Sequence, residues 1–388
     1  MTNNADRIAV LDGLRGLAII LVLFRHGIMP FWEDTSQPFW PIGPIDPGLI
    51  FLNGWIGVDL FFVLSGFLIT THLLGRYFNE DKNNMKLGSY FKRRFFRVAP
   101  VYYLVLTLVC IGFFPLYPYP ESTDNLWWRY AYHLAFMQDY LPSDITIVFW
   151  TLAVEIKFYL LAPFVLMGLL RLPSARLRYG VLIGLLMASP VLRYLSAEYI
   201  LDPFDDYASY FLNMRSFFHL SLDGLIVGML AAMAWKEQAV KDYLARPFVA
   251  DNVFYGGLGV ILVLVLSGPL VDLGGNLFNK VFLVSFLSLG FGGMLMGLVG
   301  GCKASKIFSK TGLRFMGLIS YSLYLFHLPM LYMAEMLASR LIDFSDLAAQ
   351  VMFILYMPFF LGLSVIVATL SYLAIERTFI DWAHKPLR

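Results

Sequence analysis

Ten stretches of this 388-residue sequence are apolar over enough residues to cross a lipid bilayer as a helix. Hydrophobic residues make up 59% of the chain and charged residues only 14%, against roughly 25% charged residues in a soluble domain. The sequence therefore predicts an all-α, polytopic membrane bundle of about ten transmembrane helices, with a single domain over 1–388 and no fused soluble domain. The ten stretches are 12–31, 51–74, 98–115, 147–170, 178–199, 215–235, 250–270, 280–299, 314–338 and 349–375.

The distribution of basic residues predicts how the bundle is oriented. If the N-terminus is cytoplasmic, most of the 29 lysine and arginine residues fall on inner segments, and the outer loops are acidic. Because positively charged loops stay in the cytoplasm, both termini are predicted to be cytoplasmic. The boundaries are weakest at 116–146, where a short interfacial or re-entrant helix would hold Trp127 and Trp128 at the lipid headgroups.

The first apolar stretch carries ionisable side chains, which are expensive inside a membrane. Arg15 and His26 are eleven residues apart, which puts them on the same face of a helix, about 16 Å apart along its axis. Asp12, one turn before Arg15, is positioned to hold its guanidinium group. A purely structural helix with a polar patch is the alternative, but the stacked Arg and His favour a functional site.

Two further features lie in the second and third stretches. At the cytoplasmic entrance of the third stretch, Arg94 and Arg97 are one helical turn apart, a spacing suited to an anion such as a nucleotide with several phosphates. A positive-inside signal that contacts lipid headgroups explains the same cluster. In the second stretch, the small residues Ser65 and Gly66 either allow close helix packing or leave room for a thin ligand.

Glu155, in the fourth stretch, is expected at nearly the same membrane depth as His26. A carboxylate and an imidazole at one depth can form an acid–base pair in which the carboxylate orients the ring. Lys157 is two residues from Glu155 and faces a different direction. Glu155 therefore needs a partner from another helix.

In the ninth stretch, Tyr321, Tyr324 and His327 step along one helix face. His327 is either a second base or a hydrogen-bonded core residue, and we favour the core role. The sequence has no metal-ligand spacing, nucleophile elbow or phosphate-binding glycine loop, and its two cysteines exclude a disulfide framework. No metal site is predicted.

These residues, taken in order, resemble the motifs of the acyltransferase-3 family of integral membrane acyltransferases, which includes bacterial enzymes that O-acylate surface polysaccharides. The likeness extends over essentially the whole chain, and it depends on five motifs that are each weak alone. They are LDGLRG at 11–16 followed by His26, GVDLFFVLSGF at 57–67, RFFR at 94–97, WTLAVEIKFY at 150–159 and SYSLYLFH at 320–327. Family members often carry a C-terminal hydrolase-like domain, which we do not expect in this chain.

The resemblance implies an O-acyltransferase of the bacterial inner (plasma) membrane. Its donor would be cytoplasmic acyl-CoA, with acetyl-CoA as the family's usual donor, and its acceptor a hydroxyl of a glycan or glycolipid at the outer side. Arg15, Arg94 and Arg97 would bind the phosphates of acyl-CoA, and the pantetheine arm would pass Ser65 and Gly66.

The resemblance also implies roles for the candidate catalytic residues. His26 would act as a general base on the acceptor hydroxyl or carry the acyl group transiently, and the residues leave both routes open. Glu155 would orient His26. Either Tyr321 or Tyr324 would donate a hydrogen bond to the thioester oxygen.

Two other functions are compatible with the same residues. A proton-coupled transporter of an acyl or glycan species would use His26 and Glu155 as a proton relay, although the sequence shows no internal repeat. An accessory membrane subunit would use its polar residues only to hold helices together. The expected partners are acyl-CoA, the acceptor and the lipid bilayer, with no nucleic acid, and the sequence does not define the oligomeric state.

Overall fold

The computed structural model describes residues 4–76, 87–114, 117, 125–200, 210–270 and 276–385. These residues form helices joined by loops, and this part of the chain contains no β-strand. An isolated antiparallel bridge joins Ile42 and Ile45. The all-α class predicted from the sequence is confirmed.

Each of the ten predicted apolar stretches contains a long helix. The long helices are α1 (Asn4–Ile28), α3 (Gly57–Arg76), α4 (Leu87–Cys110), α6 (Trp150–Arg171), α7 (Ala175–Leu195), α9 (Asp223–Lys236), α11 (Val249–Leu266), α13 (Leu283–Val299), α16 (Ser320–Leu341) and α17 (Ala349–Ser371).

Shorter elements connect the long helices. The short α-helices are α2 (Gly48–Leu52), α5 (Leu126–Leu134), α10 (Gln238–Leu244), α12 (Leu277–Val281), α14 (Ser305–Phe308), α15 (Thr311–Leu318) and α18 (Arg377–Ala383). The 3-10 turns are η1 (Met29–Phe31), η2 (Gly54–Ile56), η3 (Ile147–Phe149) and η6 (Phe218–Leu220), and the π-helical turns are η4 (Ser196–Ile200), η5 (Phe211–Arg215) and η7 (Tyr372–Glu376).

The predicted number of ten membrane spans is not confirmed, although the helices are present. Six spans among the described residues are long and apolar enough to cross a membrane, and α15 and α16 together would make a seventh, bent by 75°. The first half of α4 is strongly basic, α9 has only 14 residues and α13 only 17. The inner and outer faces of the bundle remain a prediction from the charge distribution.

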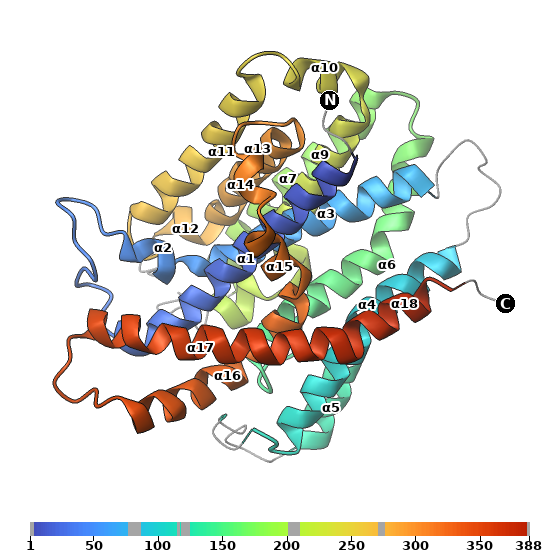
Figure 1. The fold of residues 1–388 in the computed structure, drawn as a ribbon. Coiled ribbons are helices and arrows are strands. Elements are labelled where there is room, and N and C mark those ends of the chain that lie inside the picture. The colour runs from blue at the N-terminus through green and yellow to red at the C-terminus, as the bar shows by residue number, and fades with distance from the viewer. Residues whose placement is uncertain are drawn as a thin grey trace.

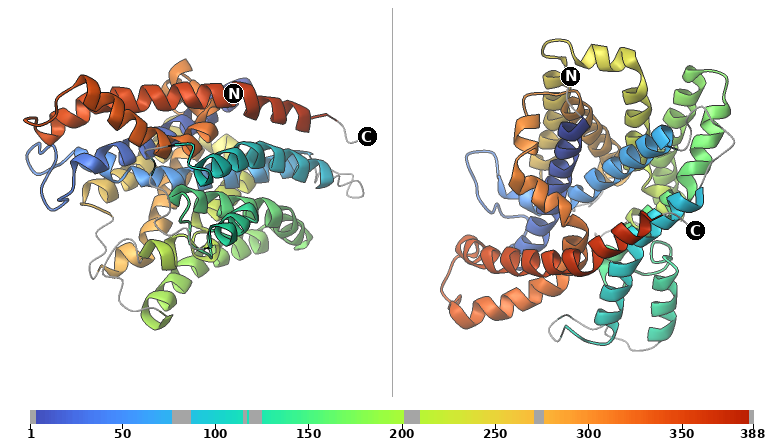
Figure 2. Two further views of the ribbon diagram at one scale, coloured as in Figure 1. Left: turned by 90° about the horizontal axis from the view of Figure 1, so that it is seen from below. Right: turned by 45° about the vertical axis from the view of Figure 1, so that its right-hand side comes forward.

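Helix α1 runs through the middle of the bundle, with α11 and α13 on one side and α4 and α6 on the other (Figure 1). It packs against α3, α15 and α16. Helices α17 and α18 lie along one side of the molecule, and α16 runs beside α17 (Figure 2). The polar side chains of α1 are therefore surrounded by other helices of the same chain.

Glycines bring neighbouring helices into backbone contact. A Cβ at Gly66 of α3 would lie 2.2 Å from the carbonyl oxygen of Leu225 in α9. A Cβ at Gly257 of α11 would lie 2.4 Å from the carbonyl oxygen of Gly290 in α13. Small residues at these positions therefore allow α3 to pack closely on α9, and α11 on α13.

The short helix α15 is held against α1 by the same kind of contact. A Cβ at Gly317 would lie 1.8 Å from the carbonyl oxygen of Asp12, and a Cβ at Gly16 would lie 2.1 Å from that of Leu313. Because these contacts join backbone to backbone, α15 fixes the position of the part of α1 that carries Asp12 and Arg15.

Two ion pairs are buried among α3, η5, α7 and α9. Arg193 of α7 forms a bidentate pair with Asp223 of α9, at 2.7 and 3.0 Å. Arg215 of η5 pairs with Asp59 of α3 at 2.7 Å. All four side chains are at most 3% exposed, so the pairs hold α7, η5, α9 and α3 together where unpaired charge would be costly.

Helix α5 occupies part of the region 116–146, whose beginning lies outside the described residues. It packs antiparallel to α4: the Tyr102 hydroxyl donates to the carbonyl oxygen of His133 (2.9 Å), and the Thr107 and Tyr130 hydroxyls are 2.9 Å apart. Its two adjacent tryptophans are exposed. A short helix was predicted here, and the structure confirms it.

Replacing Gly317 by Ala should destabilise the protein because the new methyl group meets a backbone oxygen that no side-chain movement can relieve. Overpacking of this kind costs about 1–3 kcal/mol. We expect a lower midpoint of thermal unfolding in detergent. A Cβ at Gly312, on the same short helix, would have no other atom within 4 Å, so Gly312→Ala should leave the midpoint unchanged or raise it. Equal midpoints for the two variants would contradict the proposed backbone contact.

Candidate functional site

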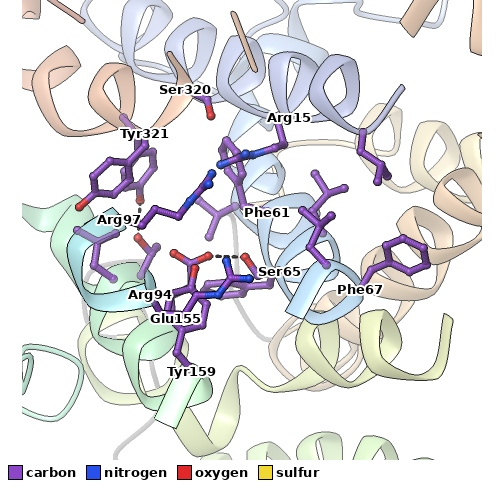
Figure 3. Close-up of a pocket in the computed structure, with 18 of the residues that line it drawn as sticks. Arg15, Phe61, Ser65, Phe67, Arg94, Arg97, Glu155, Tyr159, Ser320 and Tyr321 are labelled. Carbon is purple, nitrogen blue, oxygen red and sulfur yellow. Dashed lines mark hydrogen bonds between the residues drawn. The ribbon is translucent and has the colours of Figure 1, made fainter. Parts of the chain in front are cut away.

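A cavity of about 400 Å³ opens between helices that are far apart in the sequence. Its wall includes most of the residues that the sequence analysis selected (Figure 3). The polar lining residues are Asp12 and Arg15 from α1; Ser65, Thr71 and His72 from α3; Arg94 and Arg97 from α4; Thr151, Glu155 and Tyr159 from α6; and Ser320, Tyr321 and Tyr324 from α16.

Three guanidinium groups converge on this cavity, from Arg15, Arg94 and Arg97 (Figure 3). Within the described residues, none of the three takes part in an ion pair or a hydrogen bond. Arg94 lies 5.8 Å from the ring centres of Tyr90 and Tyr159, a favourable cation–π arrangement. The cavity therefore presents three positive charges whose hydrogen-bond donors are available to a ligand.

Asp12 was expected to hold the guanidinium group of Arg15. It lines the same cavity, but in the described part of the chain no ion pair joins the two side chains. Residues three apart share a helix face, but this spacing does not fix the rotamers that would bring the carboxylate to the guanidinium group. Arg15 is left to face the cavity.

Glu155 lies on the cavity wall and is hydrogen-bonded to the hydroxyl of Ser65 (Figure 3). Lys157 turns away and pairs with Asp139 at 2.6 Å. The prediction that Glu155 needs a partner from another helix is confirmed, and that partner is Ser65 of α3.

Ser65 and Gly66, predicted as a pair, lie on different sides of α3. Ser65 faces the cavity, whereas Gly66 faces α9, where its backbone contacts the region around Leu225. Adjacent residues on a helix point about 100° apart, so only one of them can reach a given ligand. The packing alternative accounts for Gly66.

The hydroxyl groups of Tyr321 and Tyr324 are already engaged in hydrogen bonds. Tyr321 donates to the carbonyl oxygen of Val98 at 2.6 Å. Tyr324 donates to the carbonyl oxygen of Val148 at 3.1 Å, and its oxygen lies 3.0 Å from the Thr151 hydroxyl. Each tyrosine has one hydroxyl proton, and in this structure both protons point at the backbone.

His26 lies outside the cavity wall and is paired with His327. Its Nδ1 is 3.2 Å from Nε2 of His327, and the ring centres are 4.8 Å apart. Nδ1 of His327 in turn lies 2.7 Å from the carbonyl oxygen of Tyr324. The histidine pair therefore begins one turn of α16 beyond Tyr324, where the cavity ends.

The expected hydrogen bond between Glu155 and His26 is absent among the described residues. Counting residues along two helices gives the depth of each side chain but not the direction in which it points. Glu155 points toward α3, and the imidazole of His327 occupies the position next to His26. Sequence reasoning considered His327 but did not identify this contact.

Sequence reasoning also missed Glu376, in the π-helical turn η7. This carboxylate is 3% exposed, accepts a hydrogen bond from the Ser322 hydroxyl at 2.8 Å, and interacts electrostatically with Arg97 and Arg15. Its position directly after the apolar stretch 349–375 was a detectable signal. No group of three or more candidate metal ligands occurs among the residues that the structure describes.

The sequence of this chain is similar to those of known proteins. A family model described as an acyltransferase domain matches residues 8–373. The peptidoglycan O-acetyltransferase OatA of Listeria monocytogenes is 28% identical over 344 residues, which cover 83% of this chain and 49% of that protein. The O-acetyltransferase OatA of Staphylococcus aureus is 26% identical over 345 residues, which cover 83% of this chain and 50% of that protein.

The chain thus spans about half the length of the curated relatives it matches. No solved structure matches it.

The cavity should bind a nucleotide with several phosphates, and Arg97→Gln should weaken this binding. A hydrogen bond to a charged group contributes about 1.5–3 kcal/mol, so we expect the Kd for ADP, measured by calorimetry in detergent, to rise about tenfold or more. Arg93 is a neighbouring arginine that does not line the cavity and lies 3.4 Å from the Ser89 hydroxyl. Arg93→Gln should change the Kd less than about twofold, and equal losses in both variants would point to general surface charge.

Proposed function

The chain belongs to the acyltransferase-3 family, and on this basis we propose that it is a membrane O-acyltransferase that moves an acetyl group from acyl-CoA to a hydroxyl of a glycan or glycolipid. Donor and acceptor would approach from opposite sides of a bacterial plasma membrane, with the donor and both termini of the chain at the cytoplasmic side. The alternative, a proton-coupled transporter, becomes an outcome of the experiment below.

The observation that carries this proposal is the set of three arginines on one cavity. Arg15, Arg94 and Arg97 come from two helices, face the same space, and have no ion-pair partner among the described residues. Unpaired cations within an apolar bundle are costly, and a ligand with several phosphates would compensate for them. CoA carries such phosphates at one end and a thin, flexible arm at the other.

The cavity also suggests where the acyl group would go. Tyr324 lines the same cavity as the arginines, and His327 follows it by one turn of α16. A CoA molecule held by its phosphates would extend its arm past Ser65 and Tyr324 toward His26.

Two routes for the transfer remain compatible with this arrangement. In the first, His26 takes the proton of the acceptor hydroxyl while the hydroxyl oxygen bonds to the thioester carbon, the C–S bond breaks, and the proton passes to the CoA sulfur. In the second, His26 itself bonds to the thioester carbon and CoA leaves as a thiolate. The acceptor oxygen then displaces the imidazole, and its proton neutralises the thiolate.

Glu155 has a different place in this proposal from the one predicted. Because it is bonded to Ser65 on the cavity wall, it would act on the donor side, near the arm of CoA, and His327 would be the neighbour that supports His26. The acceptor is inferred from the relatives, one of which is named a peptidoglycan O-acetyltransferase.

The proposal predicts that His26→Ala abolishes acetyl transfer while leaving the protein folded. Purified protein would be given acetyl-CoA labelled on the acetyl group together with a glycan acceptor, and both CoA release and transferred label would be measured. We expect a loss of about 100-fold or more, as for removal of a general base. His133 is also buried, with Nδ1 2.8 Å from the Arg129 carbonyl oxygen, and His133→Ala serves as the control with activity retained.

Absence of CoA release from the wild type, together with uptake of an acyl or glycan species into liposomes, would support the transporter instead. A His26→Ala substitution that lowers stability and changes little else would support the accessory subunit.

Tyr321→Phe and Tyr324→Phe should each retain acetyl transfer within about tenfold of the wild type. The hydroxyl protons of both side chains are directed at backbone carbonyl oxygens, so removing them should mainly lower stability, by about 1 kcal/mol. An oxyanion donor would instead contribute about 100-fold or more to kcat. A loss of that size in either variant, at normal thermal stability, would restore the oxyanion role for that tyrosine.

A further inference from the structure

The hydrogen-bond partners of His327 define which of its ring nitrogens carries a proton. Nδ1 of His327 lies 2.7 Å from the carbonyl oxygen of Tyr324. A carbonyl oxygen can only accept a hydrogen bond, so this Nδ1 is protonated. In the neutral ring, Nε2 is then unprotonated and acts as an acceptor.

The same reasoning extends to His26. Nδ1 of His26 is 3.2 Å from the unprotonated Nε2 of His327 and 3.0 Å from the carbonyl oxygen of Val22. Both neighbours are acceptors, so Nδ1 must carry the proton; otherwise, lone pairs would face each other at both contacts. Nε2 of neutral His26 is therefore unprotonated, and its lone pair is available for reaction.

The surroundings of the pair favour two neutral rings in the resting state. His327 is fully buried (0% exposed), whereas His26 is only half-buried. The charged side chain that acts on His26 is Arg25, and within the described residues no carboxylate is hydrogen-bonded to either ring. A further positive charge on buried His327 would have no compensating partner.

We propose that His327 is a positioning residue that holds His26 in the tautomer with an unprotonated Nε2, so that Nε2 is the nitrogen that reacts. This inference rests on the proposed function, because it concerns the reacting atom of the same site. As a base, Nε2 takes the proton of the glycan or glycolipid hydroxyl while the new C–O bond forms and the C–S bond breaks. It then releases that proton to the CoA sulfur. Nδ1 keeps its own proton throughout, and its hydrogen bond to His327 strengthens while the ring is charged.

Two substitutions at position 327 separate the acceptor atom from the bulk of the ring. His327→Phe keeps an aromatic ring without an acceptor, and His327→Gln offers a side-chain oxygen at a similar distance from the backbone. We expect kcat for acetyl transfer to fall about tenfold or more in the Phe variant and to stay within about threefold of the wild type in the Gln variant. KM for acetyl-CoA should not change in either variant, because the arginines of the cavity are untouched.

His133→Phe is the matched control, since it also removes a buried histidine whose Nδ1 faces a backbone carbonyl oxygen. Its kcat should equal that of the wild type. Folding of each variant would be checked by its thermal unfolding midpoint, and the Gln variant keeps the test decisive if the Phe variant is unstable.

The tautomer itself can be read by NMR of protein labelled with nitrogen-15 in its histidines, because protonated and unprotonated ring nitrogens have different chemical shifts. We expect His26 to be protonated at Nδ1 in the wild type and in His327→Gln. In His327→Phe the Val22 carbonyl oxygen is still an acceptor for Nδ1, so we expect a larger Nε2-protonated population than in the wild type rather than a complete switch. A folded Phe variant with wild-type kcat, equal losses in the Gln and Phe variants, or a wild-type His26 protonated at Nε2 would overturn the proposal.

The NMR spectrum is recorded without catalytic turnover, so it tests the tautomer of His26 independently of acetyl transfer. If the wild type transferred no acetyl group, the proposed function would fail, and the tautomer would still be measured.

Discussion

The cost of an unpaired charge in an apolar helix bundle is the constraint on which this structure depends. Away from the cavity, two buried arginines meet buried carboxylates: Arg193 pairs with Asp223, and Arg215 pairs with Asp59. These pairs stabilise the packing of helices only because both partners are present, since removing one partner would leave an uncompensated charge. The charges that are not paired inside the chain are therefore the ones that a ligand is expected to meet.

That distinction separates the cavity from the rest of the bundle. The three arginines of the cavity have tyrosine rings, a buried carboxylate and each other as neighbours, yet none is engaged in an ion pair among the described residues. Backbone contacts at glycines pack the surrounding helices closely against their neighbours. Helix α3 packs closely on α9 through the side that carries Gly66, and it lines the cavity through the side that carries Ser65.

Features that depend on residue spacing within one helix could be predicted from the sequence, whereas features that depend on how two helices pack could not. The helical class, the shared face of Arg15 and His26, and the need of Glu155 for a partner follow from residue spacing within single helices. The partner of Glu155 and the neighbour of His26 depend on how α3, α6 and α16 are rotated about their axes, which spacing does not fix. The count of ten spans is not confirmed: α4 begins with a basic segment, and irregular turns precede the 14-residue helix α9.

Two helices, α1 and α16, connect the two parts of the proposed site. Helix α1 carries Arg15 at the cavity and His26 beyond it, and α16 carries Tyr324 at the cavity wall and His327 beyond it. A regular helix holds residues at fixed separations along its axis, so the distance from Arg15 to His26, the histidine proposed to react, is set by the backbone of α1 rather than by loops. Helix α15, packed backbone to backbone against α1 and directly preceding α16, joins these two helices. A donor bound by its phosphates would therefore reach the histidine pair only with an arm of matching length, so the same rigidity that fixes the site also selects the donor.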